Sequence, residues 1–451
     1  MENNKRYEMM TKTPVPQLIL KLAVPTIISM LVTAFYNSAD TYFVGKISNE
    51  ATAAVGLVFS VMALIQALGF FCGHGSGNYL SRMLGAGKKK EASEMASTGF
   101  ALALLLGVIV AVTGIIFMEP IASFLGATEN SIADTKKYMA IILIGAPFMM
   151  CQFVINNQLR FQGSAMYAMV GLMIGAVINI GFDPLFIFGF KMGVAGAAIA
   201  TVSGQLVSFI VLFIASTKGE NLHLSIKNVR FHAYYMKEII NGGSPSLERQ
   251  GLAAVATVLM NNMARNYGGD AAIAAMSIVT RIMMLVNAAL IGFGQGFQPV
   301  CAFNYGAGLR SRVKEGFWFC VKYGTIFLTV MAALCIVKAP EIVAFFRDDE
   351  AVIAVAATAL RFHAAAYPFG AMIVMTNMLL QSIGRGGKAS ILASARNGIF
   401  CIPTMLLLPR FLGLLGIQIT QPIADVCSVI MAVPFALTEL MTMNDEAAKQ
   451  I

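Results

Sequence analysis

Long apolar runs of about 20 residues recur through the chain and constrain its fold more than any other feature. A helix of that length crosses a hydrocarbon core about 30 Å thick. Backbone polar groups in lipid must be satisfied within the segment, so the runs are predicted to be helices. Only 12% of the residues are charged, against about 25% in soluble domains, and the mean hydropathy is +0.73. The sequence therefore predicts an all-α polytopic membrane protein.

Twelve transmembrane helices can be marked, in two sets of six. They lie near residues 18–40, 52–72, 95–117, 138–159, 168–189 and 194–216, and then near residues 239–263, 272–294, 316–338, 354–380, 390–409 and 413–438. A polar segment separates the two sets. We therefore predict an N-terminal six-helix lobe over residues 1–216, a cytoplasmic linker over residues 217–237 and a C-terminal six-helix lobe over residues 238–451.

An internal repeat relates the two sets of helices. Adding 221 to a position in the first half reaches a matching residue in the second: Gly85-Ala86-Gly87 reaches Gly306-Ala307-Gly308, and Pro147, Asn156 and Gly163 reach Pro368, Asn377 and Gly384. Six spans is an even number, so both halves have the same orientation in the membrane. Such lobes are related by an axis along the membrane normal, as in the parallel repeats of transporters. We expect a substrate cleft between them.

The basic residues predict the orientation of the bundle. A net charge of +9 would suggest a nucleic-acid partner in a soluble protein. Here the bases gather in short loops, such as Lys88 to Lys90 and Arg310 to Lys314, on the side that also holds both termini. Cytoplasmic loops carry an excess of Lys and Arg. We predict that both termini are cytoplasmic, that there is no nucleic-acid partner, and that the first span is retained and not cleaved as a signal peptide.

Acidic residues inside the spans are few: Asp40, Asp183, Glu248 and Asp425. An aspartate at the centre of a spanning helix costs roughly 2.5–3.5 kcal/mol, so it commonly marks an ion or substrate pathway. Asn179 and Asp183 are four residues apart and share one helix face. Thr201 and Asn156 from neighbouring spans could complete an oxygen-rich pocket.

Such a pocket fits two coupling ions. Oxygen ligands from Asp, Asn and Thr suit a hard cation such as Na⁺. Two close carboxylates also share a proton and titrate as a pair, so H⁺ fits as well. Two simpler alternatives stay open. The polar residues could each bond a neighbouring helix, and the aspartates could reach water at the helix ends.

Other chemistries are disfavoured. The seven cysteines form no Cys-x-x-Cys pair and there are only four histidines, so we expect neither a disulfide framework nor a metal centre. The run Gly73-His74-Gly75-Ser76-Gly77 lacks the Lys-Ser/Thr ending of a P-loop, which argues against ATP as the power source. We expect its glycines to allow close helix packing instead. No cofactor is expected besides the coupling ion.

The chain resembles a known family from Pro16 to about Leu440. Its layout is similar to that of the multidrug and toxic compound extrusion (MATE) transporters, in particular the bacterial multidrug pumps of Gram-positive organisms. The resemblance is carried by Pro25, the run from Tyr36 to Gly45, the Gly85-Ala86-Gly87 loop with its second-half echo, and the runs from Asn179 to Pro184 and from Gly193 to Ala198. It implies two six-helix lobes in a V shape.

The resemblance also implies site residues. Related members hold the cation site in the N-terminal lobe, which by position places H⁺ or Na⁺ at Asp40, Asn179, Asp183 and Thr201, and less directly at Asn156. No cation site is expected in the C-terminal lobe, because the tenth span has Asn377 and Gln381 where some relatives carry an acid. For the substrate cleft we expect Tyr36, Asn37, Gln250, Arg281 and Asn287. Arg249 and Arg281 are unusual bases that structural ion pairs would also explain.

In function, the resemblance implies a secondary active multidrug exporter and not an enzyme. It would exchange H⁺ or Na⁺ for small organic, often cationic, compounds by alternating access across a bacterial cell membrane, and so confer antibiotic resistance. No obligate protein partner is expected. One alternative is a lipid-linked precursor flippase of the same superfamily. Such a protein would need a large, positively charged cleft and often has additional transmembrane spans. A polytopic membrane enzyme would need a cluster of His, Asp or Ser near one interface, and the sequence shows none.

Overall fold

A computed structural model describes residues 3–444, without the side chains of Asn3, Asn4, Asn37, Ser38, Thr41 and Asn49. Over that range the chain forms helices and loops and no strand. Eleven of these helices are long and apolar enough to cross a membrane. One of them, α9 (Ala233–Gly306), has 74 residues and is interrupted at Gly269, where φ is 66° and ψ is −159°. A straight helix of that length would measure about 110 Å, so α9 supplies two spans.

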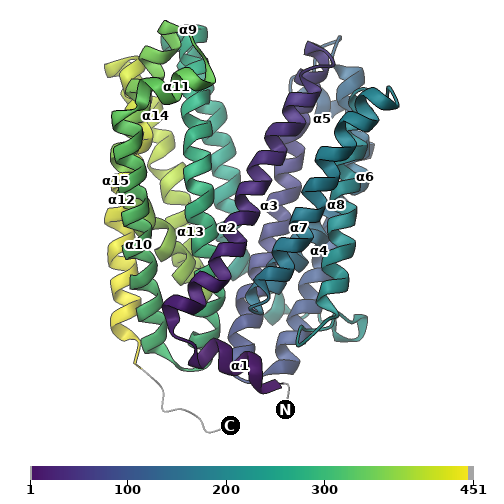
Figure 1. Ribbon diagram of the computed structural model, residues 1–451, viewed down its shortest axis with the longest axis vertical. Coiled ribbons are helices and arrows are strands. Elements are labelled where there is room, and N and C mark those ends of the chain that lie inside the picture. The colour runs from purple at the N-terminus through teal and green to yellow at the C-terminus, as the bar shows by residue number, and fades with distance from the viewer. Residues whose placement is uncertain (1–2, 445–451) are drawn as a thin grey trace.

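The predicted all-α fold with twelve spans is confirmed. The first six spans are α2 (Val15–Val44), α3 (Asn49–Gly85), α4 (Lys89–Ile116), α6 (Ile132–Phe161), α7 (Ala165–Pro184) with the π-helical η1 (Leu185–Gly189), and α8 (Val194–Ser216). The second six are the two arms of α9, α10 (Arg310–Val337), α12 (Glu350–Ser382), the run of α13 (Gly386–Ser394), η3 (Ala395–Ile399) and α14 (Cys401–Leu412), and α15 (Leu414–Thr442). They form two bundles that diverge away from the chain termini (Figure 1).

Short helices cap the bundles, and the sequence did not predict them. The short helix α1 (Asn3–Lys12) lies across the end of the molecule that holds both termini (Figure 1). The short helices α5 (Met118–Phe124) and α11 (Ala339–Phe346) follow α4 and α10, and they begin 221 residues apart. The chain between α8 and α9 contains only the 3₁₀ turn η2 (Ile226–Asn228), and α9 begins within the last residues of the predicted linker.

The backbone repeats between the halves. Gly163 and Gly384 have φ of 82° and 83°, and Gly193 and Gly413 have φ of 56° and 58° with ψ of −131° and −133°. These left-handed values favour glycine. The side-chain amide nitrogen of Asn156 donates to the carbonyl oxygen of Ala168 at 3.0 Å, and Asn377 donates to Ala389 at 2.7 Å in the second half. The two lobes therefore share one local geometry.

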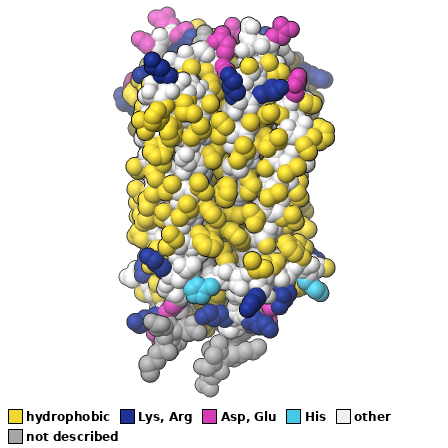
Figure 2. Space-filling view, turned by 90° about the vertical axis from the view of Figure 1, so that its right-hand side faces the viewer, with side chains coloured by type: hydrophobic (Ala, Val, Ile, Leu, Met, Phe, Trp, Pro, Cys, Tyr) yellow, Lys and Arg dark blue, Asp and Glu magenta, His cyan; other side chains and the backbone are white. Residues whose placement is uncertain are grey.

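Hydrophobic side chains cover the middle of the molecule on the face seen in Figure 2, and charged side chains gather at its two ends. This distribution matches a bilayer crossed by the bundle. Many of the outward-facing residues are large and apolar, including Val112, Val177 and Ile430. A soluble fold would bury such a surface, so the belt supports a membrane-spanning protein.

Glycines bring the two lobes together at the end near the termini. A Cβ at Gly75 would collide with the backbone of Ile239, and one at Gly85 would collide with the carbonyl group of Phe303. In the second half, a Cβ at Gly306 would collide with the carbonyl group of Arg82. The prediction that the glycines around His74 serve helix packing is confirmed at Gly75.

Candidate functional site

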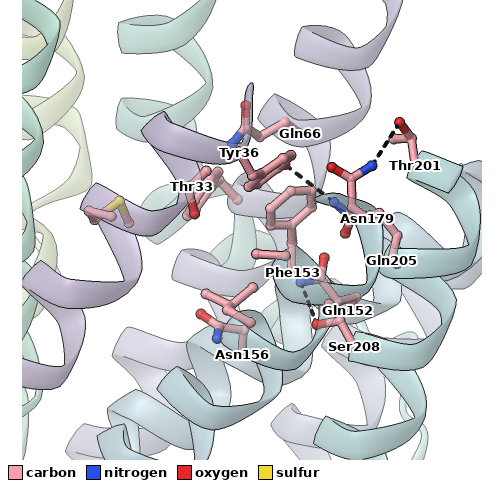
Figure 3. Close-up of a pocket in the computed structure, with 16 residues that line it drawn as sticks. Thr33, Tyr36, Gln66, Gln152, Phe153, Asn156, Asn179, Thr201, Gln205 and Ser208 are labelled. Carbon is pink, nitrogen blue, oxygen red and sulfur yellow. Dashed lines mark hydrogen bonds between the residues drawn. The ribbon is translucent and has the colours of Figure 1, made fainter. Parts of the chain in front are cut away.

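A small cavity of about 50 Å³ lies inside the N-terminal lobe, among α2, α3, α6, α7 and α8. Most of its polar lining is made of amides and hydroxyls, as Figure 3 shows: Thr33, Tyr36, Gln66, Gln152, Asn156, Asn179, Thr201, Gln205 and Ser208. Three side-chain pairs bond across it: Asn179 donates to Thr201 at 3.4 Å, Gln205 to Tyr36 at 3.4 Å and Gln152 to Ser208 at 3.1 Å. The cavity is large enough for an ion or a few waters.

Close packing of α7 on α8 builds one wall of this cavity. Gly175 and Gly204 face each other, and a Cβ on either would collide with the carbonyl oxygen of the other. Because neither residue has a side chain, the two helices approach closely. This approach brings Asn179 of α7 within hydrogen-bonding distance of Thr201 of α8. Two of the predicted site residues are thereby joined.

Asp183 lies one turn beyond Asn179 on the same helix and is completely buried. Neither of its carboxylate oxygens has a hydrogen-bond partner in the described part of the chain. Pro184 follows, and the helix widens into the π-helical turn η1. Turns of this kind are frequent at functional sites. The sequence predicted the shared face of Asn179 and Asp183, and the structure buries both residues.

Asp40 belongs to α2 and approaches the same region from another helix. Its Oδ1 atom is buried and has no partner among the described residues. The two carboxyl groups, Asp40 and Asp183, are close enough to interact electrostatically. Tyr138 of α6 lies close enough to interact with both of them, and its buried hydroxyl group lies near Thr201. Sequence reasoning missed Tyr138, because an aromatic residue in an apolar span carries no signal of its own.

The N-terminal lobe therefore contains an excess of buried acceptors. Unpaired carboxylate and amide oxygens in its described part belong to Asp40, Asn78, Gln152, Asn179, Asp183 and Gln205. Buried polar groups are normally satisfied, and a set of carboxylate and amide oxygens is the donor set of a hard cation. Protons on the two carboxyl groups would equally supply the missing donors. Over the described residues no three His, Cys, Asp or Glu side chains gather as a metal-binding group.

Asn156 and Thr201 have different surroundings. Thr201 accepts from Asn179, as expected for a member of the pocket. Asn156 also lines the small cavity, but its amide nitrogen ties α6 to the carbonyl group of Ala168. Asn377 makes the same bond in the C-terminal lobe. The repetition indicates that this bond of Asn156 holds helices together.

A second cavity, of about 480 Å³, lies between the lobes. Three of the expected cleft residues line it, namely Tyr36, Gln250 and Asn287. Arg281 is exposed and does not line this cavity. The side chain of Asn37 is outside the described residues. The lining also includes Arg249, singled out from the sequence only as unusual, and Arg396 and His363, which the sequence did not suggest.

The two acids predicted within spans of the C-terminal lobe, Asp425 and Glu248, both have hydrogen-bond partners. Arg396 donates to both carboxylate oxygens of Asp425, at 2.7 and 3.3 Å, and Gln421 donates to one of them at 3.0 Å. Glu248 accepts a hydrogen bond of 2.9 Å from Ser394. In contrast to Asp183, these carboxylates have partners. The expectation that cation chemistry belongs to the N-terminal lobe stays a prediction.

Comparison with known proteins connects this geometry to a family. The model of the MatE family matches residues 25–185 and 245–407, once in each lobe, with starts 220 residues apart. The chain belongs to the MATE family. The double match agrees with the internal repeat, and it confirms the resemblance that the sequence motifs suggested.

This MATE chain is similar to two curated relatives over almost its whole length. It is 27% identical to the multidrug export protein MepA of Staphylococcus aureus over 438 residues, which is 96% of each chain. It is 28% identical to MepA of Staphylococcus haemolyticus over 434 residues, 94% of each. It also resembles the solved outward-facing structure of a multidrug resistance MATE transporter of the MOP superfamily, with a TM-score of 0.91, 25% identity and coverage of 98% and 99%. The two curated relatives are named as multidrug export proteins, and the solved structure is named as a multidrug resistance transporter.

Proposed function

We propose that this MATE protein is a secondary active exporter of small organic compounds, driven by H⁺ or Na⁺ that binds at Asp40 and Asp183. One observation carries the proposal. Asp40 and Asp183, from different helices, are close enough to interact electrostatically, and each has a buried carboxylate oxygen without a donor among the described residues. Amide oxygens of the same lobe also have no donor there. A site in which oxygens outnumber donors binds a cation or protons favourably. Its neighbour Tyr36 lines both the small and the large cavity, and so connects the site to the substrate path.

The shape of the molecule supports alternating access. The lobes diverge at one end and meet at the other, where the termini lie (Figure 1). With the termini in the cytoplasm, as the basic loops favour, the large cavity faces outward. A cation that enters from outside would bind the Asp40–Asp183 site and change the packing of α2 against α7 and α8. The cation must bind one state better than the other, because only differential affinity shifts the equilibrium.

Transport by purified protein in liposomes tests this proposal. Drug-like fluorescent compounds would be followed under an imposed pH gradient and, separately, under an imposed Na⁺ gradient. We expect one gradient to drive accumulation, and we expect Asp40→Asn and Asp183→Asn each to reduce it by at least about tenfold, because the amide carries no charge to exchange. Asp348→Asn is the matched control, since Asp348 is exposed in the segment between α11 and α12. Normal coupled transport by both site variants would contradict the proposal.

A second candidate is a lipid-linked precursor flippase. One observation favours it, since the lining of the large cavity contains two arginines and, over the described residues, no acid. The twelve spans and the cavity volume of about 480 Å³ favour a small compound instead. The substrate range of the two candidates differs, so competition between a polyprenyl phosphate and a small organic anion for the large cavity separates them.

A further inference from the structure

We propose that the inter-lobe cavity selects amphipathic organic anions, and that Arg249 is the residue that binds their negatively charged group. The proposal deepens the proposed function, on which it rests for the role of this cavity as the substrate path. It names a substrate class: an aromatic or aliphatic body of drug size that carries one carboxylate or sulfonate. The resemblance to the family favours cationic compounds, so the two expectations can be separated by experiment.

The charge of the cavity wall is the first argument. Of the charged residue types, its described lining contains Arg249 and Arg396 but neither Asp nor Glu. A guanidinium group is always protonated, so both arginines carry positive charge. An organic cation in this space would meet positively charged side chains and no lining carboxylate. An anion would meet complementary charge in surroundings of low dielectric constant, where that charge counts most.

The two arginines are not equivalent. Arg396 forms its ion pair with Asp425, and this carboxylate neutralises it from behind the wall. Among the described residues, the guanidinium group of Arg249 forms neither an ion pair nor a hydrogen bond. The positive charge of Arg396 lies close enough to repel it. Its neighbour Glu248 bonds Ser394 instead. Arg249 is therefore the uncompensated charge that faces the cavity, with five N–H donors available.

A third positive charge lies beneath the floor of the cavity. Arg160 is only 4% exposed and binds the side chains of Asn157 and Gln295, and Gln295 lines the cavity. No acid pairs with Arg160 in the part of the chain that the structure describes. The potential inside the cavity is thus positive from its floor and from its C-terminal wall.

The remaining lining suits the body of an amphipathic compound. Phe59, Phe70 and Phe153 and the methionines Met62, Met260 and Met284 present flat aromatic and flexible apolar surfaces. Methionine side chains adapt to ligands of different shape. A volume of about 480 Å³ matches the range of drug-sized sites. Apolar contacts would allow the cavity to bind compounds of different shapes, and Arg249 would make it prefer those with a negatively charged group.

Binding to the purified full-length protein in detergent tests the proposal. The probes are one fluorescent aromatic monocarboxylate, its neutral methyl ester and a cationic amine of the same ring system, each followed by fluorescence polarisation. We expect the wild type to bind the carboxylate at least about tenfold more tightly than the ester or the amine, as a charge-assisted hydrogen bond allows. Arg249→Gln should remove that preference and leave binding of the ester unchanged. Arg249→Lys should keep part of it.

The control variant is Arg265→Gln, which removes an exposed arginine from the same helix. The affinities of the three probes are also compared on the wild type alone. The charge preference can therefore be tested even if the Arg249→Gln protein does not fold. Tighter binding of the amine than of the carboxylate by the wild type would overturn the proposal.

A competition arm separates the two sources of an anionic group. A polyprenyl phosphate is added against the bound carboxylate. The polyprenyl phosphate could compete far better than small carboxylates, in a way that depends on Arg249. That result would support the anion preference, and it would contradict drug export in favour of a lipid flippase. Gradient-driven transport could instead depend on Asp40 and Asp183 while the probes show no charge preference. That result would support the export function and contradict the proposed selection of anions.

Discussion

Arg160 of the N-terminal lobe donates a hydrogen bond to the side-chain oxygen of Gln295 in the C-terminal lobe. The bond crosses between the lobes at the floor of the large cavity. His74 extends the contact, because its ring nitrogens lie 3.5 Å from the Arg160 guanidinium group and 2.9 Å from the hydroxyl group of Ser246. Residues 74 and 295 are 221 apart, so the repeat places a histidine and a glutamine at equivalent positions around one arginine.

Arg160→Met should weaken the end where the lobes meet and reduce the population of this conformation about tenfold, because hydrogen bonds to charged groups contribute roughly 1.5–3 kcal/mol. Spin labels at positions 129 and 348, both exposed between helices of the end where the lobes diverge, would report it. We expect the distance distribution to move to shorter values. An unchanged distribution in Arg160→Met, with Arg265→Gln as the control, would show that this bond does not hold the lobes.

Gly306→Ala should destabilise the protein by about 1–3 kcal/mol, since its Cβ would collide with the carbonyl group of Arg82 and force the lobes apart. The matched control is Gly251→Ala in the same helix, where no atom lies within 4 Å of the added Cβ. That change should be neutral or stabilising by up to about 1 kcal/mol, as for a glycine in the middle of a helix. Thermal unfolding in detergent measures both, and the opposite signs make the comparison decisive. Equal effects would count against tight packing at Gly306.

Asp425→Asn should cost about 3 kcal/mol or more, because it leaves the largely buried Arg396 without its counter-charge. The double variant Arg396→Gln with Asp425→Asn should recover most of the loss, since the uncompensated charge is then absent. Glu341→Gln removes one partner of the exposed pair with Lys338 and should have no measurable effect. Unfolding midpoints of the four proteins, including the wild type, test the idea. A double variant no more stable than Asp425→Asn would refute it.

The sequence predicted much of the fold because lipid leaves few alternatives. All twelve spans were located from apolar length alone, and the repeat at 221 residues anticipated the equivalent bonds of Asn156 and Asn377. The helix ends were underestimated, since helices such as α3 continue through polar residues beyond the apolar core. The short helices α5 and α11 escaped notice because neither is long enough to register as a span.

The site was predictable only where its signal is local. The four-residue spacing of Asn179 and Asp183 places them on one face of one helix, and an aspartate such as Asp40 stands out in an apolar run. The approach of Tyr138 depends on how α6 packs against other helices, which no spacing encodes. For the same reason the sequence could not distinguish Arg249, which faces the cavity, from Arg281, which does not line it. Both are bases within α9, and only the rotation of the helix separates them.

Under the proposed export function, the number of charges that Asp40 and Asp183 admit per cycle sets how much free energy each cycle draws from the membrane potential. Each elementary charge that crosses the membrane at 100 mV supplies about 2.3 kcal/mol. From the membrane potential alone, one charge per cycle therefore supports a concentration ratio of about 50, and two charges support a ratio of about 2,000. A cycle that admits one cation and expels one anion moves two charges. Asp425 is already paired with Arg396, so moving more charges per cycle would require more than one cation to bind at Asp40 and Asp183.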